Sequence, residues 1–308
     1  MKKGVWLAIG AYTAWGLFPI YWKWLHAVPA VQLVAHRIVW SFVLLAIVLT
    51  VLRQWRAFRF EAMHWHTVRI YFIAGLLLSV NWGVYVWAVN AGYIVETSLG
   101  YFINPLLSVM LGVIILHERL RRAQWVAVGL AAAGVLYLTL VSGAPPWIAL
   151  ILATTFGLYG LVKKMAPLGA LHGLSLETGL LVVPMLLFLL FAEVNGQGAF
   201  LHSEGVSTLL IVGTGIVTVV PLLMFASAVR LIPLSLIGIL QYIAPTLQFL
   251  IGVLIFGEAF TSTQFVGFGL VWAAVILFTT ESIWTRRQAA VRLNEVKLHA
   301  TPEEVSEA

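Results

Sequence analysis

The chain has 308 residues, of which 61% are hydrophobic and only 10% are charged, and its mean hydropathy is +0.99. Soluble proteins carry about 25% charged residues because water must solvate their surface. This composition therefore excludes an ordinary soluble protein and predicts a surface that faces lipid. The net charge of +6 does not indicate a nucleic-acid partner, because the Lys and Arg residues lie between apolar runs instead of sharing a soluble face with aromatic residues. The absence of cysteine excludes disulfides and cysteine metal sites.

Ten segments are long and apolar enough to cross the roughly 30 Å of hydrocarbon as helices. The first follows Met1-Lys2-Lys3 and continues to Leu25, which is too long for the apolar part of a signal peptide. The predicted spans are residues 4–25, 32–52, 68–90, 97–116, 123–141, 147–164, 173–192, 207–230, 235–256 and 263–284. We thus predict an all-α polytopic membrane protein with ten transmembrane helices.

The positive charges predict the orientation of these spans. Apart from Lys23 and Arg37, which lie inside the first two spans, all Lys and Arg residues fall at the termini or in the even-numbered loops. Lys and Arg concentrate on the cytoplasmic side of membrane proteins. We therefore expect a multi-pass protein of the inner or plasma membrane with both termini in the cytoplasm.

The two halves of the chain resemble each other. An offset of 140 residues pairs Pro105 with Pro245 and Glu118 with Glu258, and an offset of 141 pairs Lys23 with Lys164. Each half holds five spans, an odd number, so the second half must enter the membrane from the opposite face. The sequence thus predicts two inverted five-helix repeats at residues 1–141 and 147–285, a linker at 142–146, and a polar cytoplasmic tail at 286–308 that is disordered or loosely helical.

Inverted repeats are typical of secondary transporters, because two similar halves of opposite orientation can form an outward-open and an inward-open state of similar energy. The predicted function is therefore alternating-access transport of a small molecule across the bilayer. The alternatives are a membrane channel or a lipid-translocating protein. The scarcity of charged residues that could line a pore disfavours an ion channel.

A few ionisable residues inside the spans are candidates for the transport site. A charge near the bilayer centre costs about 2.5–3.5 kcal/mol on insertion scales, so such residues are commonly functional. His36 and Arg37 lie in the second span, and Glu177 lies at the matching depth of the seventh. Arg37 is expected either to face a cavity and attract an anionic group or to extend to the interface, an alternative that also applies to Lys23.

Polar residues on two matched helix faces indicate the wall of a cavity. Tyr101, Asn104 and Pro105 share one face of the fourth span, and the ninth span repeats this face with Gln241, Pro245 and Gln248. Pro105 and Pro245 are predicted hinges, because proline releases a helical carbonyl group. The alternative interpretation is interhelical packing with a few hydrogen bonds.

Aromatic residues and a further amide extend this predicted cavity. Asn81 and Tyr85 lie one turn apart in the third span, and Trp15 and Tyr242 are expected to join them. Tryptophan and tyrosine also form belts at the membrane interface. This second interpretation is preferred for the remaining tryptophans near span ends, Trp6, Trp22, Trp24, Trp65 and Trp284.

Small residues predict close helix contacts in the fifth and tenth spans. The motifs Gly129-x-x-x-Ala133 and Gly269-x-x-x-Ala273 occupy matching positions. Such motifs allow helix backbones to approach closely. They could pack the two halves together or form a homodimer, and the sequence leaves both alternatives open.

No catalytic or nucleotide-binding motif is present: the sequence has no P-loop, HExxH, GxSxG or GxGxxG. We therefore predict no enzymatic activity, cofactor or metal, and transport that is not driven by ATP.

Four segments resemble the EamA-type transporters of the drug/metabolite transporter superfamily, and specifically the RarD-type permeases. They are AHRIVWSF at 35–42, NWGVYVWAVN at 81–90, SLGYFINPLLSVMLG at 98–112 and LQYIAPTLQFLIGV at 240–253. The resemblance extends over residues 4–287. It implies ten spans in two inverted halves, and movement of metabolites, amino-acid-like compounds or drugs, without identifying the substrate.

Overall fold

The structure is a computed structural model that describes residues 2–91, 93–142, 147–200, 202, 205–257 and 262–299. The described part of the chain is helical and contains no strand. The helices are α1 (Lys2–Gly16), α2 (Phe18–Trp24), α3 (Ala30–Val51), α4 (Trp55–Ala62), α5 (Trp65–Asn90), α6 (Ile94–Ile114), α7 (Arg122–Ser142), α8 (Trp147–Met165), α9 (Ala170–Val194), α10 (Gly205–Leu231), α11 (Leu234–Gln241), α12 (Ile243–Leu254) and α13 (Ser262–His299).

Eight stretches of the described helices are long and apolar enough to cross a membrane. They lie in α3, α5, α7, α8, α9, α10 and α13 and along α11 together with α12. The other two predicted spans fall on α1 with α2, which is interrupted at Leu17, and on α6, whose apolar described stretch is Gly100–Ile114. The all-helical membrane fold is confirmed, whereas the count of ten spans stays a prediction.

Two predicted spans are interrupted near the middle of the bundle. α1 ends at Gly16 and α2 begins at Phe18, while α11 ends at Gln241 and α12 begins at Ile243. Proline explains both interruptions, because it has no N–H to donate to the carbonyl group four residues earlier. Pro19 thereby releases the carbonyl of Trp15, and Pro245 releases that of Gln241.

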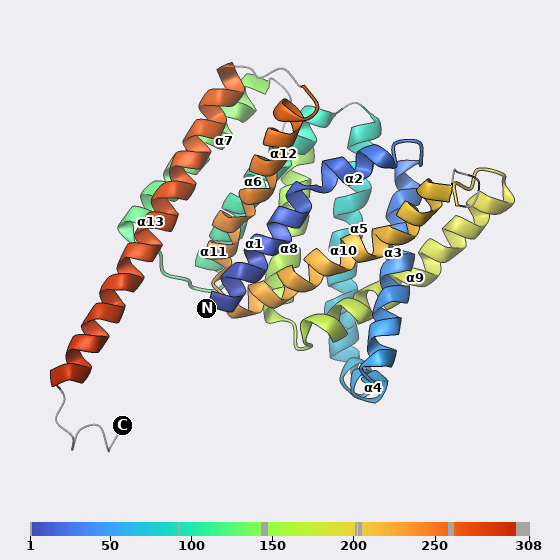
Figure 1. Cartoon of the computed structure of the whole chain (residues 1–308), viewed down its shortest axis with the longest axis horizontal. Coiled ribbons are helices and arrows are strands. Elements are labelled where there is room, and N and C mark those ends of the chain that lie inside the picture. The colour runs from blue at the N-terminus through green and yellow to red at the C-terminus, as the bar shows by residue number, and fades with distance from the viewer. Residues whose placement is uncertain are drawn as a thin grey trace.

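The ends of the bundle differ in charge. One end carries most of the Lys and Arg residues, and we call it the basic end. It contains the start of α1, the whole of α4, and the junctions between α6 and α7, α8 and α9, and α10 and α11 (Figure 1). α2, the start of α3 and the end of α12 lie at the other end (Figure 1). The helix α4 was not predicted, and it packs Phe58 against Ala62, Tyr71 and Leu168.

Helices from the two halves of the sequence interlock. α1 and α3 pack on α10, and α6 packs on both α8 and α11. At the crossing of α6 with α11, a Cβ atom on Gly238 would lie 2.5 Å from the carbonyl oxygen of Pro105. α7 and α13 pack side by side at the edge of the bundle, where they also contact α6 (Figure 1).

The pairing of α7 with α13 corrects one interpretation of the sequence. Gly134 and Gly267 make the close contacts, since a Cβ on Gly134 would lie 2.9 Å from the Gly267 carbonyl oxygen. By contrast, a Cβ on Gly129 or Gly269 would meet no described atom within 4 Å. The interpretation that these two motifs pack the halves together is therefore wrong, and a role in a homodimer stays a prediction.

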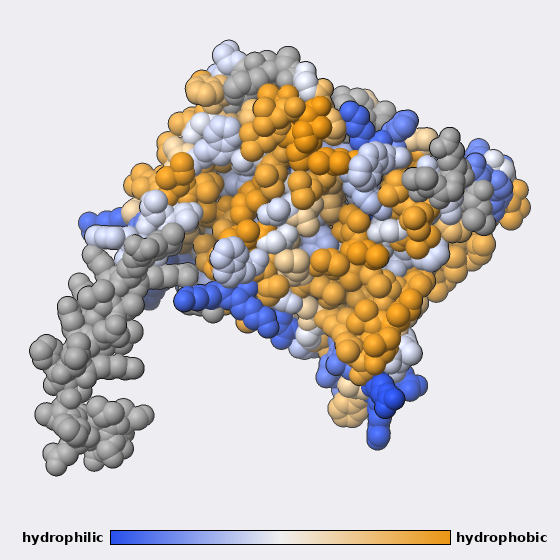
Figure 2. All heavy atoms as spheres, in the orientation of Figure 1, coloured by the Kyte–Doolittle hydropathy of each residue, from blue (hydrophilic) through white to orange (hydrophobic). Residues whose placement is uncertain are grey.

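The surface confirms that the bundle needs a lipid environment. Large apolar side chains of α9 are widely exposed, including Leu187 at 61%, Phe191 at 69% and Val194 at 87%. Figure 2 shows a broad hydrophobic surface across the middle of the molecule, with hydrophilic residues at the α4 end and at the opposite end. In addition, α13 continues to His299, so the described part of the predicted polar tail is helical.

We expect Gly238→Ala to lower the melting temperature of the purified protein in detergent, because overpacking a close helix crossing costs about 1–3 kcal/mol. Gly129→Ala is the matched control, since its new methyl group enters open space and alanine favours a helix over glycine. Thermal unfolding followed by tryptophan fluorescence measures both. Equal melting temperatures for the two variants would contradict the close approach of α6 and α11.

Candidate functional site

A cavity of about 300 Å³ lies between the two halves of the sequence. We call it the central cavity. α1, α2, α3, α5 and α6 contribute to its wall from the first half, and α8, α10, α11 and α12 contribute from the second. Its lining residues are Tyr12, Trp15, Phe18, Pro19, Trp22, Arg37, Leu78, Asn81, Trp82, Tyr85, Gly100, Tyr101, Asn104, Leu152, Phe156, Leu222, Gln241, Ala244, Pro245 and Gln248.

Arg37 is the charged residue in this wall. Its Nε donates a hydrogen bond of 3.0 Å to Thr218 Oγ1. Its guanidinium carbon lies 4.1 Å from the ring centroid of Trp82, 5.1 Å from that of Trp22 and 6.0 Å from that of Phe18. No carboxylate pairs with Arg37 among the described residues. A guanidinium held by aromatic faces keeps donors free for a planar anion such as a carboxylate.

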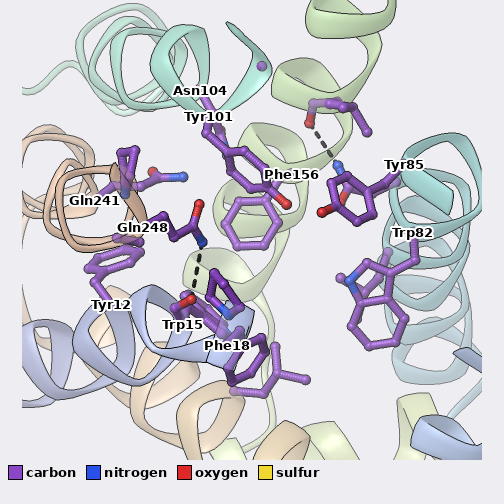
Figure 3. Close-up of a pocket in the computed structure, with 18 of the residues that line it drawn as sticks. Tyr12, Trp15, Phe18, Trp82, Tyr85, Tyr101, Asn104, Phe156, Gln241 and Gln248 are labelled. Carbon is purple, nitrogen blue, oxygen red and sulfur yellow. Dashed lines mark hydrogen bonds between the residues drawn. The ribbon is translucent and has the colours of Figure 1, made fainter. Parts of the chain in front are cut away.

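Amide side chains provide the neutral polar groups of the cavity. Asn81 Nδ2 donates to the Leu152 carbonyl oxygen at 2.8 Å, and Gln248 Nε2 donates to the Trp15 carbonyl oxygen at 3.1 Å (Figure 3). The second bond satisfies the carbonyl that Pro19 releases, and it joins α12 to α1. Asn104 is 5% exposed, and its Oδ1 accepts no hydrogen bond from the described residues. This oxygen can accept a hydrogen bond from a bound molecule.

Aromatic rings form most of the remaining wall. Tyr85 of α5 and Tyr101 of α6 meet edge to face, with centroids 6.0 Å apart. The ring centroids of Trp15 and Phe156 lie 5.8 Å apart. Figure 3 shows Trp82 and Tyr85 on one side of the space, with Gln241, Gln248 and Trp15 across from them. The cavity therefore combines apolar faces with a cation and several amides, which suits a small amphipathic molecule.

An aromatic cluster closes the central cavity toward the basic end. Phe225 of α10 lies at its centre, with its ring centroid 5.6 Å from Trp15, 5.5 Å from Phe156 and 6.0 Å from Tyr159. Residues of α2, of the second half of α5 and of the first half of α6 line the cavity. These segments lie away from the basic end, so the cavity is nearer the opposite end of the bundle.

Charged side chains bind backbone groups beneath this cluster. Glu118 accepts hydrogen bonds of 2.6 and 2.8 Å from the first two N–H groups of α11. Lys164 Nζ donates to the carbonyl oxygens of Val229 and Ile232 at 2.9 and 2.7 Å. Arg230 donates to the carbonyl oxygens of Ala166 and Leu168. Because these bonds join helix ends around α8, α10 and α11, they hold the basic end closed.

The structure brings together nine of the thirteen residues that the sequence analysis selected for the cavity and its hinges. They are Trp15, Arg37, Asn81, Tyr85, Tyr101, Asn104, Gln241, Pro245 and Gln248. Their predicted role in binding stays a prediction.

The other four residues lie outside the described lining. His36 is buried with its ring 5.5 Å from that of Phe200, because it points away from its neighbour Arg37. Tyr242 is turned into a packed cluster, where its hydroxyl group donates to the Phe102 carbonyl oxygen at 3.2 Å. Pro105 lies at the crossing with Gly238.

Glu177, the fourth of these residues, forms a buried ion pair. Its Oε2 lies 2.7 Å from Lys163 Nζ, and the two side chains are 2% and 3% exposed. The sequence predicts Lys163 to be one of the loop charges that orient the protein, and the structure corrects this because Lys163 turns inward from α8. The adjacent Lys164 is the residue that matches Lys23 in the repeat.

Several residues of the site were not selected from the sequence. Trp22 was interpreted as an interface residue, but its ring faces Arg37 inside the cavity. Trp82, Phe156 and Tyr12 also line the wall. The position of Trp82 beside Asn81 was the available signal, whereas the phenylalanine and tyrosine resemble core residues in any helix sequence.

Comparison with known proteins supports the likeness found in the sequence. The sequence profile of the EamA-like transporter family matches residues 2–140 and again residues 145–280. A Streptomyces exfoliatus protein named Protein RarD is 45% identical over 95% of this chain and 93% of its own length. A Bacillus subtilis protein named uncharacterized transporter YojE is 45% identical over 92% of this chain and 96% of its own length.

One solved crystal structure has the same fold. It superposes with a TM-score of 0.68 over 94% of this chain and 99% of its own, at 19% sequence identity.

We expect Glu177→Leu to lower the free energy of unfolding by about 3–5 kcal/mol, because it leaves Lys163 charged and unpaired in the interior. The double variant Lys163→Met/Glu177→Leu should recover most of this loss, since two apolar side chains of similar volume replace the pair. Denaturant unfolding in detergent micelles measures both proteins. A double variant no more stable than Glu177→Leu would contradict the buried pairing.

Proposed function

Because the chain belongs to the EamA-like transporter family, we propose that it is a secondary transporter that moves a small metabolite, amino-acid-like compound or drug by alternating access. The observation that carries this proposal is the central cavity, which both halves of the sequence line and which the Phe225 cluster closes toward the basic end. A transporter of this kind exposes one binding site to each side in turn.

The proposed architecture is a pair of inverted five-helix repeats, residues 1–141 and 147–285, with both termini in the cytoplasm. The two matches of one family profile to the two halves support the repeat. Under this topology the basic end faces the cytoplasm and the described conformation faces outward. Inward opening then requires Glu118, Lys164 and Arg230 to release the backbone groups that they bind.

We propose that the substrate binds in the central cavity through an anionic group. Arg37 is the anchor, because it has free guanidinium donors and no described carboxylate partner. Asn104 and Gln241 supply neutral hydrogen-bonding groups, and Trp15, Tyr85 and Tyr101 contact the apolar part of the substrate. An open channel is disfavoured as the alternative, because a conducting path would have to pass the packed rings around Phe225.

Topology can be tested directly because the chain contains no native cysteine. Asn195→Cys lies beyond the end of α9, and Met63→Cys lies between α4 and α5 at the basic end. In intact cells, a membrane-impermeant maleimide should label Asn195→Cys, and it should label Met63→Cys only after permeabilisation. Labelling of both positions from outside would overturn the inverted arrangement.

The role of Arg37 can be tested by uptake into vesicles over a panel of metabolites and antibiotics. For the compounds that the wild type transports, Arg37→Ala should reduce initial rates about ten- to hundredfold, because a hydrogen bond to a charged group contributes about 1.5–3 kcal/mol. Arg37→Lys should retain only part of the wild-type rate, since an ammonium group lacks the planar pair of donors. Arg121→Ala, which removes an exposed arginine paired with Glu281, is the control with the same change of charge. Wild-type rates in Arg37→Ala would exclude Arg37 from the mechanism.

A further inference from the structure

The Lys163–Glu177 pair lies outside the wall of the central cavity and beside it. Among the described ion pairs, it is the one in which both side chains are almost fully buried. A buried pair adds little stability over apolar residues of the same size, because desolvation offsets the attraction. Ionisable residues inside membrane helices are characteristic of ion and proton pathways. The pair therefore calls for a functional explanation.

The helices around Glu177 present few other ionisable groups to it. From α8, Tyr159 places its hydroxyl group beside the carboxylate without a well-formed hydrogen bond. From α5, the Tyr71 ring lies 5.0 Å from Lys163 Nζ, and its hydroxyl group donates to the Leu168 carbonyl oxygen. α3 and α10 contribute the uncharged hydroxyl groups of Ser41 and Thr218.

The remaining charges near α9 are bound elsewhere. Arg230 of α10 is held by the carbonyl oxygens of Ala166 and Leu168, and Glu61 of α4 pairs with His172 at 2.7 Å. Lys163 is therefore the charged partner of Glu177 among the described residues, and a change in the protonation of Glu177 acts first on Lys163.

A second, much smaller cavity lies beside Glu177 and borders the central one. It has a volume of about 20 Å³, which is room for one water molecule. Glu177, Ser41 and Thr218 line it, and it shares Leu78, Trp82 and Leu222 with the central cavity. Ser41 Oγ and Glu177 Oε1 are buried polar atoms without a hydrogen-bond partner among the described residues, and both belong to residues of this lining. A water molecule here could satisfy both and pass a proton.

Thr218 joins this small cavity to the candidate anchor for the substrate. Its hydroxyl oxygen accepts the hydrogen bond from Arg37 Nε at 3.0 Å, and the same residue lines the cavity beside Glu177. An anion that binds Arg37 changes the charge balance only a few side chains from the pair. The two sites are thus close enough to influence each other electrostatically.

We propose that the Lys163–Glu177 pair is a proton-binding site reached from the central cavity, and that transport is coupled to protons through it. This inference rests on the proposed function. The proton binds the Glu177 carboxylate, which becomes neutral, while Lys163 keeps its positive charge, so the pair changes from net zero to net positive. Loss of the ionic contact loosens the link between α8 and α9 beside the closed basic end.

Proton binding can be measured without any substrate. Infrared difference spectra of the purified protein, recorded as the pH is lowered, should contain a protonated-carboxyl band that disappears in Glu177→Gln. Glu193→Gln, which alters an exposed carboxylate paired with His202, should keep this band. The double variant Lys163→Met/Glu177→Leu should also lack it and provides a second test if Glu177→Gln does not fold. A spectrum of Glu177→Gln identical to that of the wild type would overturn the proposal.

Coupling is tested with a compound that the vesicle panel has shown to be transported. A pH difference of one unit is a tenfold proton ratio, so it should shift the accumulation of a compound moved with one proton by up to about tenfold. The shift should be retained in Glu193→Gln and absent in Glu177→Gln. For each variant, accumulation with the pH difference is compared with accumulation at equal pH on both sides. A shift that persists in Glu177→Gln would overturn the coupling role. If no compound is transported, the proposed function fails, while the infrared titration still decides whether Glu177 binds a proton.

Discussion

A helix that is interrupted inside a bilayer must find partners for the backbone groups that the interruption releases, because hydrocarbon offers none. This constraint locates the central cavity. Pro19 and Pro245 interrupt two predicted spans, and the cavity lies between the two interruptions. Gln248 binds the carbonyl that Pro19 releases on Trp15, so one side chain both repairs the first helix and forms part of the wall.

Charge inside the bundle is handled in two different ways. Arg37 is held by aromatic faces and a hydroxyl group, and it keeps donors directed to the cavity. Lys163 and Glu177 instead neutralise each other out of contact with solvent. The first arrangement attracts a ligand, and the second changes its net charge only when a proton enters or leaves. Thr218 touches both environments, and this proximity is what makes a coupled mechanism physically reasonable.

Sequence patterns predicted the membrane fold well because the bilayer imposes simple rules of length and polarity. The matched faces of the fourth and ninth spans also identified Tyr101, Asn104, Gln241 and Gln248 as neighbours of one cavity, because polar residues in apolar helices turn inward. The interruption between α1 and α2 was harder to predict. Pro19 was present in the sequence, but hydropathy averages over such local effects and suggested one continuous span.

The sequence patterns did not predict where some aromatic and charged side chains point. Trp22 lies near a span end, as interface tryptophans do, and only the bend after Gly16 turns its ring toward Arg37. Lys163 and Lys164 are adjacent, so a count of loop charges treats them alike. Their side chains point in different directions around the helix, and one is buried against Glu177 while the other binds the end of α10.

The position of this pair along the chain also bears on biogenesis. Lys163 and Glu177 are 14 residues apart and flank the short turn between α8 and α9. Because closing so short a loop costs little entropy, the two charges can meet within a nascent helical hairpin before the following helices are synthesised. Lys163 and Glu177 then enter the lipid as a neutral pair, which spares the insertion machinery from having to transfer either of these two charges alone.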